Sequence, residues 1–212
     1  MQLLHSYNQR SVAPAYLDEG HYDWEDVAKP PDFGTPSVLR REEYWTMLSG
    51  RKGQFYGNRY SWTFAPGWES HLDTVGVKQL TICKSFFTSL PCQDLVPDQD
   101  HRIVTLGPGI HRDLQTRESQ NDYCTVSRTT DSSFVVAYMP TARTITVNMT
   151  SLKTFAHARW FDPTKGTYTT IPGGPFLKAG TRHFVPPGNN RDGDSDWVLL
   201  LDASGSTSES TR

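Results

Sequence analysis

The feature that most constrains the fold is a change of sequence pattern near residue 95. Residues 1–95 mix strand-like and helix-like segments, whereas residues from about 100 to 202 form short β-rich runs separated by turns. Prolines 91 and 97 lie at the change. The pattern therefore predicts an α/β domain over 1–95, an all-β domain over 96–203 and a polar, disordered tail over 204–212.

The first half alternates strands and helices. Apolar and aromatic runs predict strands at 11–19 (SVAPAYLDE) and 53–62 (GQFYGNRYSW). Apolar residues at helical spacing predict helices at 37–50 and 69–90, with Ser37 as the cap of the first. The order strand, helix, strand, helix is typical of parallel α/β structure.

The second half reads as a series of short strands. Turn residues separate neighbouring runs at 129–133 (TTDSS) and 162–166 (DPTKG). This spacing favours an antiparallel β-sandwich. The predicted strands are 102–107, 122–129, 133–140, 144–150, 157–163, 166–172, 182–187 and 196–202.

Composition excludes several classes of function. Lys plus Arg (21) nearly balance Asp plus Glu (23), and no basic run is interleaved with aromatic residues, so nucleic acid is not the expected partner. No apolar run approaches the roughly 20 residues that span a bilayer, so we expect no membrane insertion. The first ten residues lack the apolar core of a secretory signal peptide, so the chain is expected to carry no export signal of its own.

Cysteine and histidine spacing indicates no metal site and no cofactor. Cys83, Cys92 and Cys124 form no CxxC pair, and the seven histidines form no HxH or HExxH motif. The acidic run DGDSD at 192–196 could offer oxygen ligands to calcium, but it lacks the remaining positions of a calcium loop. A turn is the favoured interpretation of this run.

A cluster of carboxylates follows the first predicted strand. The stretch PAYLDEGHYDWED carries five acids: Asp18, Glu19, Asp23, Glu25 and Asp26. Acids at the end of a buried strand must be solvated, paired or used, so this is either a polar loop or half of a reaction centre. Because functional residues of parallel α/β barrels lie at the carboxyl ends of strands, Glu19 is the candidate catalytic residue.

Polar and aromatic side chains surround both predicted strand ends. His21, Tyr22 and Trp24 supply the hydrogen-bonding and stacking groups of a carbohydrate pocket. The second strand ends with Asn58, Arg59, Tyr60 and Trp62, after Gly57, which allows a bend or a close ligand approach. We expect Asn58 and Trp62 either to contact substrate or to pack ordinarily, and Phe55 and Tyr56 to belong to the core.

Long segments of the chain resemble the apiosidase-like glycoside hydrolases. YLDEGHYDW, RREEYWTMLSGRKGQFYGNRYSWTF, HLDTVGVKQL and LVPDQDHRIV resemble the closing strands and helices of that family's catalytic barrel. VVAYMPTARTITVNMTSL, ARWFDPTKGTY and VPPGNNRDGDSDWVLLLD resemble the β-domain that follows it, which carries a collagen-binding label. The resemblance covers nearly all of residues 12–202.

The resemblance implies a fold and an activity. It implies the last two βα units of a (β/α)₈ barrel followed by an antiparallel β-sandwich, and an enzyme that releases an apiose-linked side chain from a pectic cell-wall polysaccharide. Glu19 matches the expected nucleophile at the end of strand seven. Asp23 stands where relatives often have a second Glu. The implied substrate-binding residues are His21, Tyr22, Asp23, Trp24, Asn58, Tyr60 and Trp62.

The resemblance also implies that the chain is incomplete. The acid/base donor of this barrel type comes from strand four, so the isolated chain is expected to lack glycosidase turnover. The apolar faces of the two barrel strands would lack partners, and residues 1–95 would depend on packing against the β-domain. The resemblance suggests a secreted parent protein with a polysaccharide or glycan as its partner, and the oligomeric state stays open.

Two other functions are compatible with the sequence. The β-domain could be a carbohydrate- or collagen-binding module that uses Trp160, Phe161 and Tyr168, although Trp160 and Trp197 are expected to be core residues. No collagen-specific signature is visible. Alternatively, the β-domain only supports the barrel and binds nothing.

Overall fold

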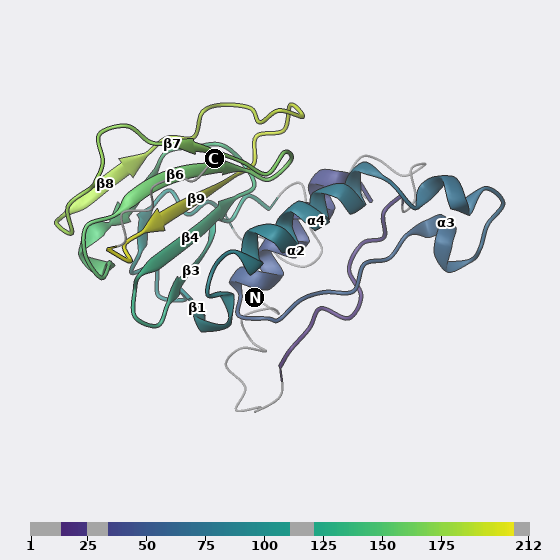
Figure 1. The fold of residues 1–212 in the computed structure, drawn as a ribbon, viewed down its shortest axis with the longest axis horizontal. Coiled ribbons are helices and arrows are strands. Elements are labelled where there is room, and N and C mark those ends of the chain that lie inside the picture. Colours follow the sequence, from purple (N-terminus) through teal and green to yellow (C-terminus); the bar gives the residue numbers. More distant parts are fainter. Residues whose placement is uncertain (1–13, 25–33, 111–120, 206–212) are drawn as a thin grey trace.

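The computed structural model describes residues 14–24, 34–110 and 121–205, and two sheets dominate it (Figure 1). The sheets lie at one end of the molecule, helices α2 (Pro36–Leu48) and α4 (Val75–Thr88) lie beside them, and the short helix α3 (Arg59–Trp62) lies at the opposite end (Figure 1). The predicted disordered tail falls outside the described residues from position 206 onward.

Two antiparallel sheets form the β-domain. The larger sheet has the order β1-β3-β4-β9-β6-β7, and the smaller sheet has the order β2-β5-β8. Every neighbouring pair is antiparallel, as the turn-rich pattern predicted. The strands are β1 (Leu95–Pro97), β2 (Val104–Leu106), β3 (Thr125–Thr129), β4 (Phe134–Met139), β5 (Ile145–Asn148), β6 (His157–Asp162), β7 (Thr167–Thr170), β8 (Thr181–Phe184) and β9 (Trp197–Asp202).

Each of the eight predicted strands overlaps one observed strand, β2 to β9, and only β8 extends beyond its predicted run, by one residue at Thr181. Strand β1 was not predicted, because prolines and a short 3-10 turn, η2 (Cys92–Asp94), obscure its pattern. It pairs with β3 through the register Leu95↔Thr129. The change of pattern near residue 95 therefore falls at a strand of the larger sheet.

The central strands β4 and β9 of the larger sheet are buried on both faces. One set of alternating residues, including Trp160 and Trp197, packs against the smaller sheet, so the prediction that these tryptophans are core residues is confirmed. Phe161 is buried too and Tyr168 remains partly exposed. Of the three aromatic residues considered for glycan stacking, two are therefore enclosed.

The other face of the larger sheet packs against α2 and α4. Tyr138 of β4 stacks on Tyr44 of α2, with ring centroids 4.7 Å apart, and Phe161 of β6 lies 4.6 Å from Phe86 of α4. Burial of these apolar side chains is the main stabilising term at this contact. The remaining members are Leu48, Cys83, Phe87, Leu95, Val136, Val198 and Leu200. The expected packing of the first half against the β-domain is thus observed for both helices.

The helices begin at threonines. Thr35, and not the predicted Ser37, accepts a hydrogen bond from the Val38 amide and caps α2, since Pro36 occupies the first helical position. Thr74 caps α4 in the same way, through the Val77 amide. The predicted helix at 69–90 is therefore too long. Its first part is a separate 3-10 turn, η1 (Trp68–His71), which leaves Leu72 and Val75 exposed.

A buried charge cluster joins α2 to the β-domain. The Arg40 guanidinium is fully buried and binds the Asp196 carboxylate at 2.8 and 2.9 Å. It also donates to Asp194 at 2.7 Å and to the Gln79 side chain on α4. Burial opposes its charge, but the two aspartates outweigh burial and raise the pKa of Arg40 above its usual range. The DGDSD run is thus a turn, as favoured, and two of its aspartates bind Arg40.

Residues 14–24 and 51–58 run side by side in parallel. Backbone hydrogen bonds join Lys52 to Ala15 and Leu17 to Gly53. Two parallel bridges pair Leu17 with Gln54 and Asp23 with Asn58. These two segments replace the continuous strands that the sequence predicted, because their pairing is interrupted. The prediction that Phe55 and Tyr56 are core residues is wrong: they are 64% and 39% exposed.

None of the helices in the described ranges combines the length and apolar character that a membrane span requires. Within the same ranges, no group of three or more His, Cys, Asp or Glu side chains is placed to hold a metal ion.

Candidate functional site

Glu19 lies in a bulge between the two parallel segments. From Leu17 to Asp23 the first segment advances six positions, whereas its partner advances only four, from Gln54 to Asn58. The first segment therefore has two additional residues, and its backbone leaves the pairing before returning to it. Pairing resumes where the Asp23 amide donates to the Gly57 carbonyl at 2.9 Å.

The bulge exposes Glu19 and binds it to a neighbouring tyrosine. The Tyr22 hydroxyl donates to Glu19 Oε1 at 3.2 Å. The ring of Tyr22 passes so close to Gly57 that a Cβ at this position would lie 2.5 Å from it. Gly57 thus permits the close approach of Tyr22, whereas the sequence suggested a bend or the approach of a ligand.

Helix α2 holds the centre of the bulge. Glu42 Oε2 accepts a hydrogen bond from the His21 backbone amide at 2.9 Å, and its other oxygen lies 3.9 Å from His21 Nε2. A Cβ at Gly20 would lie 2.7 Å from Glu42 Oε2, so this carboxylate occupies the space beneath the bulge. Glu42 therefore fixes the backbone that carries Glu19.

Asp23 is buried where the two parallel segments pair for the second time, at the bridge between Asp23 and Asn58. Its carboxylate accepts hydrogen bonds from the Tyr56 hydroxyl at 2.8 Å and from the Thr74 hydroxyl at the start of α4. Burial is the main cause that raises the pKa of Tyr56 to about 12, so Tyr56 remains a donor at neutral pH. Only 2% of Asp23 is exposed, and its contacts hold elements of the fold together.

Asn58 is buried as well, contrary to the expectation that it lies beyond the buried part of the strand. Its Oδ1 accepts hydrogen bonds from the Tyr60 and Ser61 amides, which caps α3. Its Nδ2 donates to the His71 carbonyl at 3.1 Å and to the Tyr56 hydroxyl at 3.3 Å. Asn58 therefore connects the second segment, α3 and η1.

Aromatic side chains gather around α3 and η1. Tyr60 stacks on His71 with ring centroids 3.7 Å apart, and Trp24 meets both rings edge-on at 6.3 and 5.5 Å. Trp62 meets Tyr22 edge-on at 6.3 Å and is 66% exposed. Exposed aromatic faces beside a carboxylate are characteristic of sites that bind sugar rings.

The sequence predicted most of these residues but missed their supports. Seven of the eight candidate residues take part in the contacts above through their side chains. His21 takes part through its backbone amide, and its ring nitrogen lies 3.9 Å from Glu42. Sequence reasoning missed Glu42, His71 and Thr74. Glu42 is one of two adjacent acids in RREE, and only the register of α2 shows that it faces the bulge.

The arrangement offers one solvent-accessible carboxylate, a tyrosine donor and aromatic surfaces. A carboxylate in this setting can attack or stabilise a cationic sugar carbon. The second carboxyl group of a glycosidase must lie about 5 Å away in a retaining enzyme.

Comparisons with known families agree with these observations. Residues 2–94 match the family model described as "Apiosidase-like, catalytic domain", and residues 112–202 match the model described as "Putative collagen-binding domain of a collagenase". No curated protein matches the chain.

Solved structures of similar fold carry glycoside hydrolase titles. A protein titled "Glycoside hydrolase" aligns over 96% of this chain with 19% identity and a TM-score of 0.72. A glycoside hydrolase family 5 protein from Bacteroides vulgatus aligns over 96% with 19% identity and a TM-score of 0.76. The chain spans 45% and 44% of their lengths, respectively. The two family matches together cover most of the chain and support an apiosidase-like glycoside hydrolase portion, and the solved structures show a similar fold.

Proposed function

We propose that the bulge and the aromatic cluster form the nucleophile half of a glycosidase active site. The observation that carries the proposal is the exposed Glu19 carboxylate, held by Tyr22 in a bulge beside aromatic rings. Because Glu42 fixes the His21 backbone, the nucleophile is positioned before substrate binds. The match of residues 2–94 to the apiosidase-like catalytic model supports the reaction class.

Each candidate residue has a proposed role. Glu19 attacks the anomeric carbon, and Tyr22 orients the attacking carboxylate. Trp24, Tyr60 and Trp62 contact sugar rings, with His21 at the edge of the site. Asp23 and Asn58 act through the residues they position, since both are buried.

The family resemblance is the basis for the proposed substrate and for the position of the proton donor. We place the two parallel segments as the last strands of a (β/α)₈ barrel, with the proton donor on an earlier strand. The substrate is an apiose-containing pectic polysaccharide met outside the cell. Without the donor, the 212-residue chain has no turnover of its own.

The test uses a chain that spans the length of the solved relatives and contains these 212 residues. Glu19→Gln should lower kcat on an apiosyl oligosaccharide at least 1,000-fold, because an amide cannot form the glycosyl-enzyme bond. Azide should restore turnover of an activated substrate by Glu19→Ala and yield a glycosyl azide. That product distinguishes a lost nucleophile from a lost fold.

Asp18→Asn is the matched control, since it removes the adjacent exposed carboxylate and should leave kcat within about twofold. Full activity of Glu19→Gln would reject Glu19 as nucleophile. Turnover by the 212-residue chain would reject the claim that the donor lies elsewhere.

A further inference from the structure

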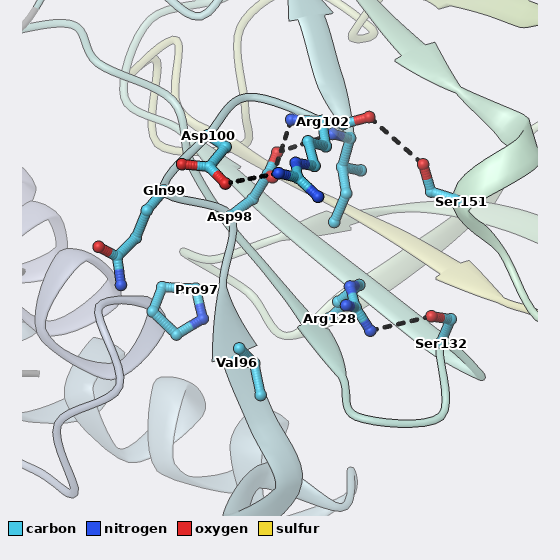
Figure 2. Close-up of a pocket in the computed structure, with 10 residues that line it drawn as sticks. Val96, Pro97, Asp98, Gln99, Asp100, Arg102, Arg128, Ser132 and Ser151 are labelled. Atoms are coloured by element: carbon cyan, nitrogen blue, oxygen red, sulfur yellow. Dashed lines mark hydrogen bonds and ion pairs between the residues drawn. The ribbon is translucent and has the colours of Figure 1, made fainter. Parts of the chain in front are cut away.

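A hollow lies on the β-domain, on elements that do not contribute to the Glu19 site. Its volume is about 460 Å³, and its lining comes from β1, the loop that follows β1, the β3–β4 hairpin and η4 (Met149–Ser151) (Figure 2). Val96, Pro97 and Ile103 supply the apolar part of the lining. The polar part consists of Asp98, Gln99, Asp100, Arg102, Arg128, Ser132 and Ser151.

The carboxylates of this hollow already have partners. Asp98 accepts hydrogen bonds from the Arg102 and Ile103 backbone amides at 2.9 and 2.8 Å. Asp100 pairs with the Arg102 guanidinium at 3.2 Å (Figure 2). Nearby Asp131 binds Lys153 at 2.8 Å. In the part of the chain that the structure describes, none of these three carboxylates forms an ion pair with Arg128.

Arg128 is held in place on one side only. Its Nη1 donates to the Thr129 and Thr130 carbonyls at 3.2 Å each and to the Ser132 hydroxyl at 3.0 Å. Within the described residues, its Nε and Nη2 make no hydrogen bond and the guanidinium has no carboxylate partner. The free edge, Nε with Nη2, is one that binds a carboxylate through two parallel hydrogen bonds.

Hydroxyl groups complete the lining around this cation. Ser132 lies beside Arg128, and Ser151 lies across the hollow, where its hydroxyl donates to the Arg102 carbonyl at 3.3 Å (Figure 2). A serine hydroxyl that donates to the protein still has acceptor lone pairs for a ligand hydroxyl. We propose that this hollow binds a uronic acid unit of an acidic saccharide, with its carboxylate on Arg128 and its hydroxyls on the serine side.

An acidic peptide is the less suitable ligand. Its carboxylates stand on flexible side chains, and an acidic peptide carries no hydroxyl groups to meet Ser132 and Ser151. A uronic acid presents a carboxylate and several hydroxyls within one ring, which matches one arginine surrounded by polar groups. This inference does not depend on Glu19 or on the proposed glycosidase activity.

Calorimetry on the 212-residue chain tests the proposal with tetragalacturonate and its methyl ester. The free acid should bind, and esterification should weaken binding at least 10-fold, because it removes the charge that pairs with Arg128. Arg128→Gln should produce a similar loss. Arg159→Gln is the matched control, since Arg159 lies on β6 over the Tyr168 ring, and its Kd should be unchanged.

A second variant keeps the hairpin intact. Ser151→Tyr adds bulk from the opposite side of the hollow, and it should weaken binding at least 10-fold with the thermal midpoint unchanged. Equal binding of acid and ester would overturn the proposal. Wild-type affinity in a folded Arg128→Gln chain, or equally tight binding of tetraglutamate, would also overturn it.

Discussion

The larger sheet and the pair of parallel segments contrast two outcomes for similar β-forming residues. In the sheet, β4 has a strand on each side, helices on one face and a second sheet on the other. The segment 51–58 also contains two aromatic residues, Phe55 and Tyr56, but it includes Gly53 and Gly57, its described partner is one interrupted segment, and Phe55 is 64% exposed. A regular strand thus forms where an apolar run is packed on every side, and the glycine-containing run with one partner stays irregular.

The two regions also differ in what their side chains contribute to the protein. The sheet and its helices hold the buried apolar clusters, whereas the bulge and the aromatic cluster expose side chains that a ligand could touch. We therefore expect substitutions at the helix–sheet contact to change the free energy of unfolding. Substitutions in the exposed region should change it little.

The largest effect is expected at Arg40. Arg40→Met would leave the buried Asp196 carboxylate without its guanidinium, which should lower the free energy of unfolding by about 3–5 kcal/mol. Lys78→Ala, which breaks the exposed pair with Asp73, should cost under about 1 kcal/mol. Urea unfolding measures both. If the two variants were equally stable, the buried cluster would not hold α2 to the β-domain.

A pair of leucines gives the next largest difference. Leu48 is fully buried in the helix–sheet contact and Leu72 is 52% exposed after η1. Leu48→Ala should cost about 3 kcal/mol through lost burial and a cavity, whereas Leu72→Ala should stay within about 0.5 kcal/mol. Thermal unfolding followed by circular dichroism measures both. Similar losses would mean that the exposed region also contributes to the folded core.

The smallest effect concerns pH. Burial raises the pKa of Glu43 on α2 to about 7, and the neighbouring Glu42 carboxylate adds to the shift. Between the unfolded value near 4.5 and about 7, the folded chain holds a proton that the unfolded chain releases, so stability falls as pH rises. A shift of this size corresponds to at most about 3 kcal/mol between pH 4.5 and 8, and the partial exposure of Glu43 reduces that cost through solvent screening.

Glu43→Gln should remove that part of the pH dependence and stabilise the chain at pH 8. Urea unfolding of both proteins at pH 5 and pH 8 measures the difference. Identical pH profiles would place Glu43 in contact with solvent. The effect of Glu43→Gln on the free energy of unfolding would then match that of a substitution in the exposed region.

The β-domain could be predicted in detail from the sequence because its strands are short, apolar and separated by turn residues. All eight predicted runs overlap observed strands, whereas β1 was missed since Pro97 and η2 hide a three-residue strand. In the first half, both helices were predicted but Thr35 and Thr74 replaced the expected boundaries. Helix ends depend on single capping residues, which periodicity does not detect.

The candidate site could be predicted only as a set of residues. Their types pointed to Glu19, Tyr22, Trp24 and Trp62, but no pattern showed the two-residue bulge that exposes Glu19. Burial separated Asp23 and Asn58 from their exposed neighbours, and this depends on Tyr56, Thr74 and His71. Such contacts are formed between segments, so they are visible only in the folded chain.

The position of β1 has a consequence for recombination between genes. The two family matches leave residues 95–111 unmatched between them. Strand β1 of the larger sheet and strand β2 of the smaller sheet both lie in this stretch. A β-domain transferred from residue 112 onward would lose one strand from each sheet, along with the helices that cover Val136, Tyr138 and Leu200. An exchange of this module between proteins would have to carry α2, α4 and the residue 95–110 segment with it.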